Sequence, residues 1–149
     1  MLSTLVAGRR DLLRALEGLS DEDLTRAGVS GAWSVRDILA HVAAWDRQVV
    51  LALEAWLEGT TPPQAVTDVD GFNAQVTAAA SGESPVATLL VLARTHADTS
   101  ACVARAQGRS GEFVDPGSGL PTTVSHLVDD IAGHERDHAA GILAWRGRR

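Results

Sequence analysis

Residues 33–46 read WSVRDILAHVAAWD, and this stretch decides how the chain folds. Ser34 followed three residues later by Asp37 is typical of a helix N-terminus in which the two side chains cap each other's backbone N–H groups. After this cap, apolar residues recur every three or four positions, which is the spacing of one face of an α-helix. The stretch therefore predicts the first turns of a long amphipathic helix that ends at Gly59.

The same spacing recurs in other segments of the chain. It predicts long helices over about residues 2–19, 85–107 and 123–145, and a shorter helix over residues 69–80. Residues 108–121 hold four glycines and two prolines, which indicates a loop, and no segment shows the alternation of a β-strand. On the third long helix we expect these residues to be buried: Val86, Leu89, Leu90, Ala93, Ala97 and Val103.

These helices predict an all-α protein, built as an antiparallel four-helix bundle in one domain that covers residues 1–149. A chain of this length can form a single hydrophobic core.

The amino-acid composition restricts the kinds of molecule that the chain is expected to bind. With 13 basic and 19 acidic residues, the chain has a formal net charge of −6, which argues against nucleic acid because binding phosphates requires a positive surface. No uncharged apolar run approaches the ~20 residues that span a bilayer, so we expect no membrane association. Cys102 is the single cysteine, so it has no partner for an internal disulfide. We expect a cytoplasmic protein.

Two histidines of the last helix stand where its pattern requires apolar side chains. His134 and His138 continue the inward series, and an unsatisfied polar group in a core costs on the order of 1–3 kcal/mol. Residues four apart lie one above the other on a helix, so both rings can bind one zinc or nickel ion. His41, one turn from Ile38 and Trp45, supplies a third nitrogen if the second and fourth long helices are neighbours.

Other interpretations of the histidines remain open at this point. Each can be a buried side chain satisfied by ordinary hydrogen bonds, which is the more common situation for a lone histidine beside a core. His126 is on a different face of its helix from His134 and is expected at the surface. His96 is near the buried edge of the third long helix, from which it could support the site without binding the metal.

Three runs of sequence, residues 33–46, 68–76 and 131–138, are spread over most of the chain. Together they resemble the DinB-like superfamily, and most closely its ClbS/DfsB group. The resemblance implies an up-down-down-up four-helix bundle, often dimeric, with a metal bound by one histidine of the second helix and two of the fourth. His41, His134 and His138 occupy these places.

The relatives implied by this resemblance include transferases and isomerases that use mycothiol, bacillithiol or glutathione. Another branch protects its host from a reactive genotoxin by opening an electrophilic cyclopropane. The first hypothesis is therefore a metal-dependent enzyme, a thiol- or water-dependent transferase or hydrolase that acts on a small electrophile in detoxification or self-resistance. It would hold a divalent zinc or nickel ion, with either a low-molecular-weight thiol or water as the attacking group, and a homodimer is a candidate assembly because relatives are often dimeric. The alternative is a non-catalytic protein of the same fold that binds or sequesters a small molecule.

Aromatic residues near the histidines are candidates for substrate binding, with core packing as the alternative. The substrate-binding prediction covers Trp33, Trp45 and Phe72, and Trp56 is a further aromatic residue that could line the same pocket.

The sequence identifies no catalytic residue. Three carboxylates near the histidines could orient a ring or move a proton, although charge on a solvated helix face is the default interpretation: Asp46, Glu135 and Asp137. Glu135 follows His134 directly but points about 100° away around the helix. Tyrosine is absent, which excludes a mechanism that needs a phenol, and Cys102 is expected to be a small core residue.

Overall fold

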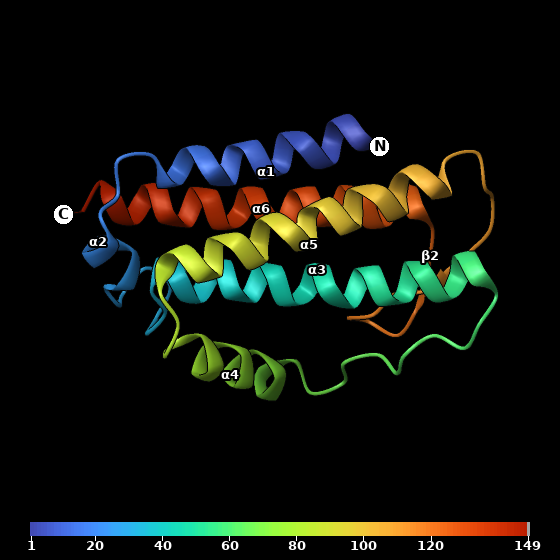
Figure 1. Ribbon diagram of the computed structural model, residues 1–149, viewed down its shortest axis with the longest axis horizontal. Coiled ribbons are helices and arrows are strands. Elements are labelled where there is room, and N and C mark those ends of the chain that lie inside the picture. The colour runs from blue at the N-terminus through green and yellow to red at the C-terminus, as the bar shows by residue number, and fades with distance from the viewer. Residues whose placement is uncertain (149) are drawn as a thin grey trace.

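A computed structural model describes residues 1–148 of the chain. The structure has four long helices within residues 1–148, and they form a bundle. Two of them run one way and the other two run the opposite way (Figure 1). The first direction is shared by α1 (Leu2–Leu16) and α6 (Val124–Arg146), and the second by α3 (Val35–Glu58) and α5 (Pro85–Ala106). The predicted all-α bundle is confirmed, and the helices run in the up-down-down-up order.

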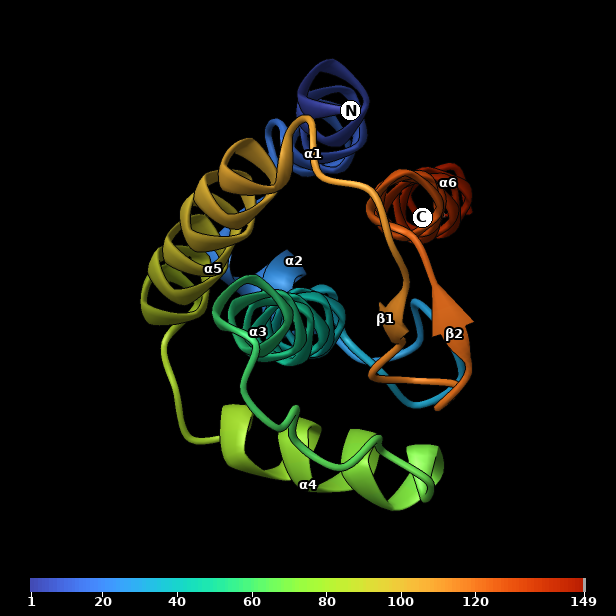
Figure 2. The ribbon, with the colours of Figure 1, turned by 90° about the vertical axis from the view of Figure 1, so that its right-hand side faces the viewer.

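Four short elements complete the fold. A one-turn helix, α2 (Asp21–Thr25), follows α1, and α4 (Val69–Ala80) lies outside the bundle against α3 (Figure 2). Two strands that the sequence did not predict, β1 (Phe113–Val114) and β2 (Pro121–Thr122), pair antiparallel in the loop before α6. Strands of two residues are too short to show an alternating pattern. No helix within residues 1–148 is long and apolar enough to cross a membrane.

Caps fix the position of α3. The Ser34 hydroxyl accepts from the backbone N–H of Asp37, and the Asp37 carboxylate accepts from the backbone N–H of Ser34. Gly59 ends the helix in the left-handed conformation, with φ 67°. The first long helix ends at Leu16 rather than at Leu19, because the chain turns through Gly18 at φ 77°.

The long helices are unevenly spaced. A Cβ atom on Gly8 of α1 would lie 2.8 Å from the Cα atom of Ala132 of α6, so the two backbones touch where only glycine fits. By contrast, α3 and α6 approach each other much less closely along their lengths. The space between them is wide enough for large polar side chains from both helices.

The buried apolar side chains form two separate clusters, one toward each end of the bundle. Between them each long helix contributes at least one polar side chain at a core position. We call this set the polar layer, and it consists of Arg9 of α1, Asp46 of α3, Thr95 and His96 of α5, and Glu135 of α6.

The predicted buried face of α5 is wrong, except for Val103 and the half-buried Leu89. Val86 is 58% exposed and Leu90 is 67% exposed, and Ala93 and Ala97 are exposed as well. The face that is buried carries three threonines in place of aliphatic residues: Thr88, Thr95 and Thr99. Their hydroxyls donate to backbone carbonyls of the same helix, so the threonines can be buried without an unsatisfied polar group. Because threonine is not counted as an apolar residue, the spacing of apolar residues did not indicate this face.

Candidate metal centre

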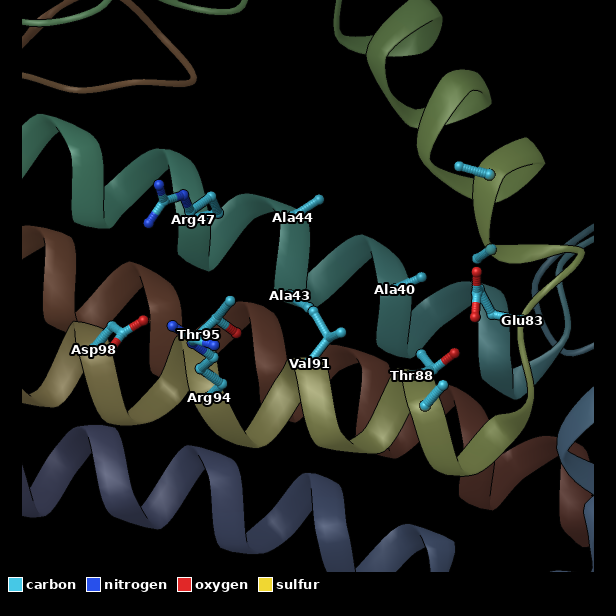
Figure 3. Close-up of a pocket in the computed structure, with 13 residues that line it drawn as sticks. Ala40, Ala43, Ala44, Arg47, Glu83, Thr88, Val91, Arg94, Thr95 and Asp98 are labelled. Atoms are coloured by element: carbon cyan, nitrogen blue, oxygen red, sulfur yellow. The ribbon is translucent and has the colours of Figure 1, made fainter.

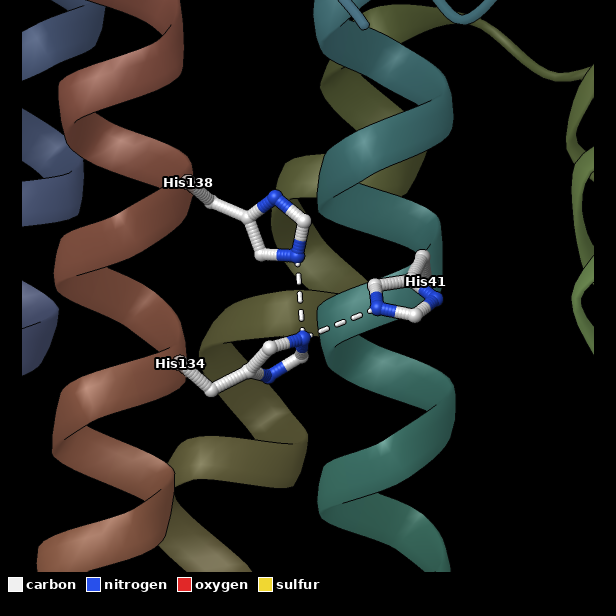
Figure 4. Close-up of side chains that lie close together, drawn as sticks. All are labelled: His41, His134 and His138. Carbon is white, nitrogen blue, oxygen red and sulfur yellow. Dashed lines mark hydrogen bonds between the residues drawn. The ribbon is translucent and has the colours of Figure 1, made fainter. Parts of the chain in front are cut away.

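Three histidine rings from two helices meet in the space between α3 and α6 (Figure 4). His41 is buried in the second turn of α3, and His134 and His138 are half-buried one turn apart on α6. The Nε2 atom of His134 lies 2.9 Å from Nε2 of His41 and 2.9 Å from Nε2 of His138. The structure thus brings together the three rings selected from the sequence, with one nitrogen of each facing a common point.

Asn73 of α4 holds the ring of His41 in one tautomer. Its Oδ1 atom lies 2.9 Å from Nδ1 of His41 and 3.1 Å from Nε1 of Trp45. An indole N–H can only donate, so the shared oxygen is an acceptor, and Nδ1 of His41 carries the hydrogen that it donates. A neutral His41 therefore has a bare lone pair on Nε2, the nitrogen that faces the other two rings.

Hydrogen bonds among the rings cannot satisfy all three nitrogens. Because Nε2 of His41 can only accept, its contact with His134 is a hydrogen bond only if Nε2 of His134 carries a hydrogen. That nitrogen then has no lone pair to accept from His138, so at most one of the two contacts is a hydrogen bond while the rings are neutral. A divalent cation, which takes a lone pair from each nitrogen, fits this donor set.

Burial keeps the three rings neutral near pH 7. Burial, together with the charge of a protonated His134, lowers the pKa of His41 from 6.5 to about 4. The pKa of His138 falls to about 3, first through burial and then through the charges of the other two rings. Burial also lowers the pKa of His134. Neutral imidazole is the form that binds metal, so protons compete weakly with a cation at neutral pH.

The sequence profile of the DinB superfamily matches residues 4–142. The chain belongs to the DinB superfamily. No curated protein and no solved structure matches it significantly. Proteins of the DinB superfamily are metal-binding, and the half-buried cluster with a convergent set of nitrogens fits that property. The role of each histidine as a ligand stays a prediction.

The predicted substrate-binding aromatics of this DinB-superfamily chain gather beside His41. The ring of Trp33 lies 5.1 Å from the His41 ring and that of Trp45 lies 6.4 Å from it, between ring centres. Phe72 is one ring further away and packs on Trp45 at 5.0 Å. Trp33 and Asn73 also line a cavity of about 570 Å³ between α4 and the start of α3. Trp56 packs on Phe113 instead, away from these rings.

The carboxylates near the histidines are placed differently from the prediction. Asp46 and Glu135 were expected on solvated faces, but the two residues are 3% and 0% exposed, and both bind Arg9. The reason is that the buried face of α6 is centred on Glu135, while His134 and His138 lie at its edge. Asp137 is exposed, and no carboxylate within residues 1–148 forms a hydrogen bond to a ring of the cluster.

A second group of side chains in the polar layer could also hold a metal. One potential ligand atom each from Asp46, His96 and Glu135 lies within 4.8 Å of the others. Here, however, the Arg9 guanidinium lies 2.8 Å from Asp46 and 2.6 Å from Glu135, so the chain supplies its own cation. His96 belongs to this layer and not to the histidine cluster, while His126 is exposed, as predicted.

Proposed function

We propose that this protein is a metal-dependent enzyme of the DinB superfamily in which His41, His134 and His138 hold one divalent zinc or nickel ion. The observation that carries the proposal is the set of three Nε2 atoms, of which two pairs lie 2.9 Å apart and cannot both be hydrogen-bonded. Three protein ligands would leave coordination positions free for a substrate, as in catalytic metal sites.

The reaction that this site supports best is transfer or hydrolysis on a small electrophilic molecule. A divalent ion held by neutral imidazoles would lower the pKa of a coordinated thiol or water and provide a nucleophile near neutral pH. Asn73 orients His41 for this task, and Trp33 and Trp45 offer apolar surface beside it for the substrate. We place the protein near the ClbS/DfsB group, acting in cytoplasmic detoxification or self-resistance with a low-molecular-weight thiol.

One observation favours a second function, a non-catalytic protein that binds or sequesters a small molecule. The two buried carboxylates nearest in sequence to the histidines are bound to Arg9 in the polar layer, so neither contacts a ring of the cluster. A site without a carboxylate to orient a ring or move a proton suits binding as well as catalysis.

Elemental analysis of the untagged protein separates the two functions. The enzyme predicts near-stoichiometric zinc or nickel in the wild type, loss of the metal in His134→Ala, and retention in the exposed control His126→Ala. The metal-loaded protein should then consume thiol when it is screened with epoxides and cyclopropanes in the presence of glutathione, mycothiol or bacillithiol. Metal-free protein of unchanged stability would favour the binding protein.

We also propose that the protein forms a homodimer through the exposed face of α5. This face carries Val86 and Leu90, which are more than half exposed, followed by the exposed alanines Ala93 and Ala97. An apolar stripe of this kind on a water-soluble bundle is typical of a contact surface. Light scattering should give twice the chain mass for the wild type and a single chain mass for Leu90→Glu. A monomeric wild type at all concentrations contradicts the dimer.

A further inference from the structure

A groove runs between α3 and α5 (Figure 3). Its α3 side is lined by Ala40, Ala43, Ala44 and Arg47, which lie on a different face of the helix from His41. Its volume is about 610 Å³, within the range of ~300–1,000 Å³ found for small-molecule sites. Alanine is the most frequent residue of its walls and comes from three helices, with Ala40 and Ala44 of α3, Ala80 of α4 and Ala87 of α5 among them. Larger side chains at these positions would fill the space, so the groove exists because the sequence keeps them small.

The base of the groove offers no free hydrogen-bond donor. Ala43 is 2% exposed and belongs to the apolar core. The hydroxyl of Thr95 donates to the backbone oxygen of Leu92, and that of Thr88 donates to the backbone oxygen of Ser84, so neither hydroxyl has a hydrogen left to donate to a ligand. Val91, at the rim, is 54% exposed. The surface inside the groove therefore suits an apolar molecule.

The two ends of the groove differ in charge. Arg47 of α3 and Arg94 of α5 stand at one end together with Asp98, and Glu83 stands at the other (Figure 3). Neither guanidinium forms an ion pair with a carboxylate of residues 1–148, in a chain where acidic residues outnumber basic ones by 19 to 13. Two arginines against one aspartate leave a positive end, while the glutamate makes the opposite end negative.

We propose that this groove binds a small amphiphilic monoanion, a molecule with one carboxylate head and an unbranched apolar tail. The guanidinium groups of Arg47 and Arg94 receive the carboxylate, for which their paired N–H groups are well suited. The tail lies along the alanines and covers Val91. Glu83 repels the head from the opposite end, so the molecule binds in one orientation.

The length of the groove sets the size of the tail. An α-helix rises ~1.5 Å per residue, so Ala40 and Arg47 lie about 10 Å apart along α3, which is the length of an extended chain of about eight carbons. Octanoate is therefore the matched probe, and 1-octanol is the same tail without the charge. This site is separate from the histidine cluster, so the proposal does not depend on the metal-dependent function.

The test is a calorimetric titration of the full-length protein with octanoate in the presence of EDTA, which removes any metal that could bind the carboxylate. We expect one site per chain, with a dissociation constant on the order of 0.1–1 mM for a ligand of this size. Octanol should bind at least ~10-fold more weakly, since it cannot use the arginines. Backbone amide NMR shifts should change along residues 40–47 and 87–98.

Variants identify the contacts. Arg47→Gln combined with Arg94→Gln should weaken octanoate at least ~10-fold and leave octanol unchanged, whereas Arg14→Gln with Arg148→Gln, which removes the same charge elsewhere, should have no effect. Ala44→Leu, which fills the groove, should abolish binding of both molecules, and His134→Ala should preserve it. The proposal is overturned if octanoate does not bind, if octanol binds equally well, or if the NMR shifts centre on the histidine cluster.

Discussion

The histidine cluster and the polar layer lie side by side on α3 and α6, yet their buried polar groups are compensated in different ways. In the polar layer, Arg9 reaches two buried carboxylates at 2.8 and 2.6 Å and also donates to the backbone oxygen of Leu92. In the histidine cluster no charged side chain takes this place, and three neutral rings turn their Nε2 atoms toward one another.

The difference distinguishes the two groups of potential metal ligands. Carboxylates held around a guanidinium are already neutralised in part, so a divalent cation there would have to displace Arg9 or be repelled by it. The neutral rings have lone pairs that neither the other rings nor Asn73 can satisfy. In both groups the potential ligand atoms lie within 4.8 Å of one another, so the charge inside each group distinguishes them.

The largest expected effect on stability comes from removing Arg9, the positive charge of the polar layer. Arg9→Met leaves Asp46 and Glu135 buried without a positive partner, and breaking a buried ion pair in this way costs about 3–5 kcal/mol. The free energy of unfolding in urea at pH 7 measures the loss. Arg10→Met, one residue along α1 and exposed, should change stability by less than about 0.5 kcal/mol.

A triple variant keeps this prediction testable if Arg9→Met does not fold. Replacing Arg9 by Met, and both Asp46 and Glu135 by Leu, leaves no charge in the layer and should recover much of the lost stability, because a buried ion pair is often no better than apolar packing. A single variant as stable as the wild type would mean that the carboxylates do not depend on Arg9.

Much of this architecture was predictable from sequence, because it rests on local signals. The Ser34–Asp37 cap and the serine before Pro85 mark the starts of α3 and α5, and the apolar spacing indicates the other two long helices. His134 and His138 were found because each interrupts an apolar series that the rest of α6 maintains. Cys102 is 3% exposed, in agreement with its predicted place in the core.

The polar layer and Asn73 could not be predicted in the same way, because their roles depend on contacts between distant segments. A signal for the layer did exist, since Arg9 stands between Leu5 and Leu12 on the apolar stripe of α1. Nothing local indicates that its partners are 37 and 126 residues away. Asn73 lies on a separate helix beside Phe72, and only the packing of α4 against α3 brings it to His41.

The second prediction tests whether a metal ion binds at the histidine cluster and not in the polar layer. Nickel or zinc added at 1,000 times the dissociation constant should stabilise the wild type by about 4 kcal/mol. His134→Ala should lose this stabilisation, whereas His96→Gln, in the polar layer, should keep it. Thermal unfolding with and without metal measures both variants. If only His96→Gln lost the stabilisation, the result would indicate that the metal binds in the polar layer.

The third prediction concerns the orientation of His41. Asn73→Ala removes the acceptor for the Nδ1 hydrogen and should weaken metal binding by ~10–100-fold, the usual effect of losing an outer partner of a ligating histidine. Asn73→Asp retains an acceptor and should keep most of the affinity. Gln75→Ala, an exposed site on the same helix, is the control, and competition with a chromogenic chelator gives the dissociation constants. If Asn73→Ala and the wild type bound the metal with equal affinity, Asn73 would have no role in orienting His41 for the metal.

The smallest effect is a difference in the pH dependence of the metal-free protein. The pKa of His41 is lowered from 6.5 to about 4, so between these values the unfolded chain binds a proton that the folded protein does not. The contribution of His41 to the free energy of unfolding is therefore fully present above pH 6.5 and falls as the pH is lowered toward 4. Burial, against the charge of Arg9, raises the pKa of Asp46 from 3.8 to about 6, so the folded protein binds the extra proton and stability from Asp46 rises as the pH is lowered.

The two regions should therefore respond oppositely to neutral substitutions when unfolding is followed in EDTA between pH 7 and 4. His41→Gln removes a group that destabilises the fold in acid, so stability should decline less steeply than in the wild type. Asp46→Asn removes a group that opposes this decline, so stability should fall more steeply. Slopes that change in the same direction in both variants would show that the rings and the carboxylates titrate as one network, which would remove the distinction between the two regions.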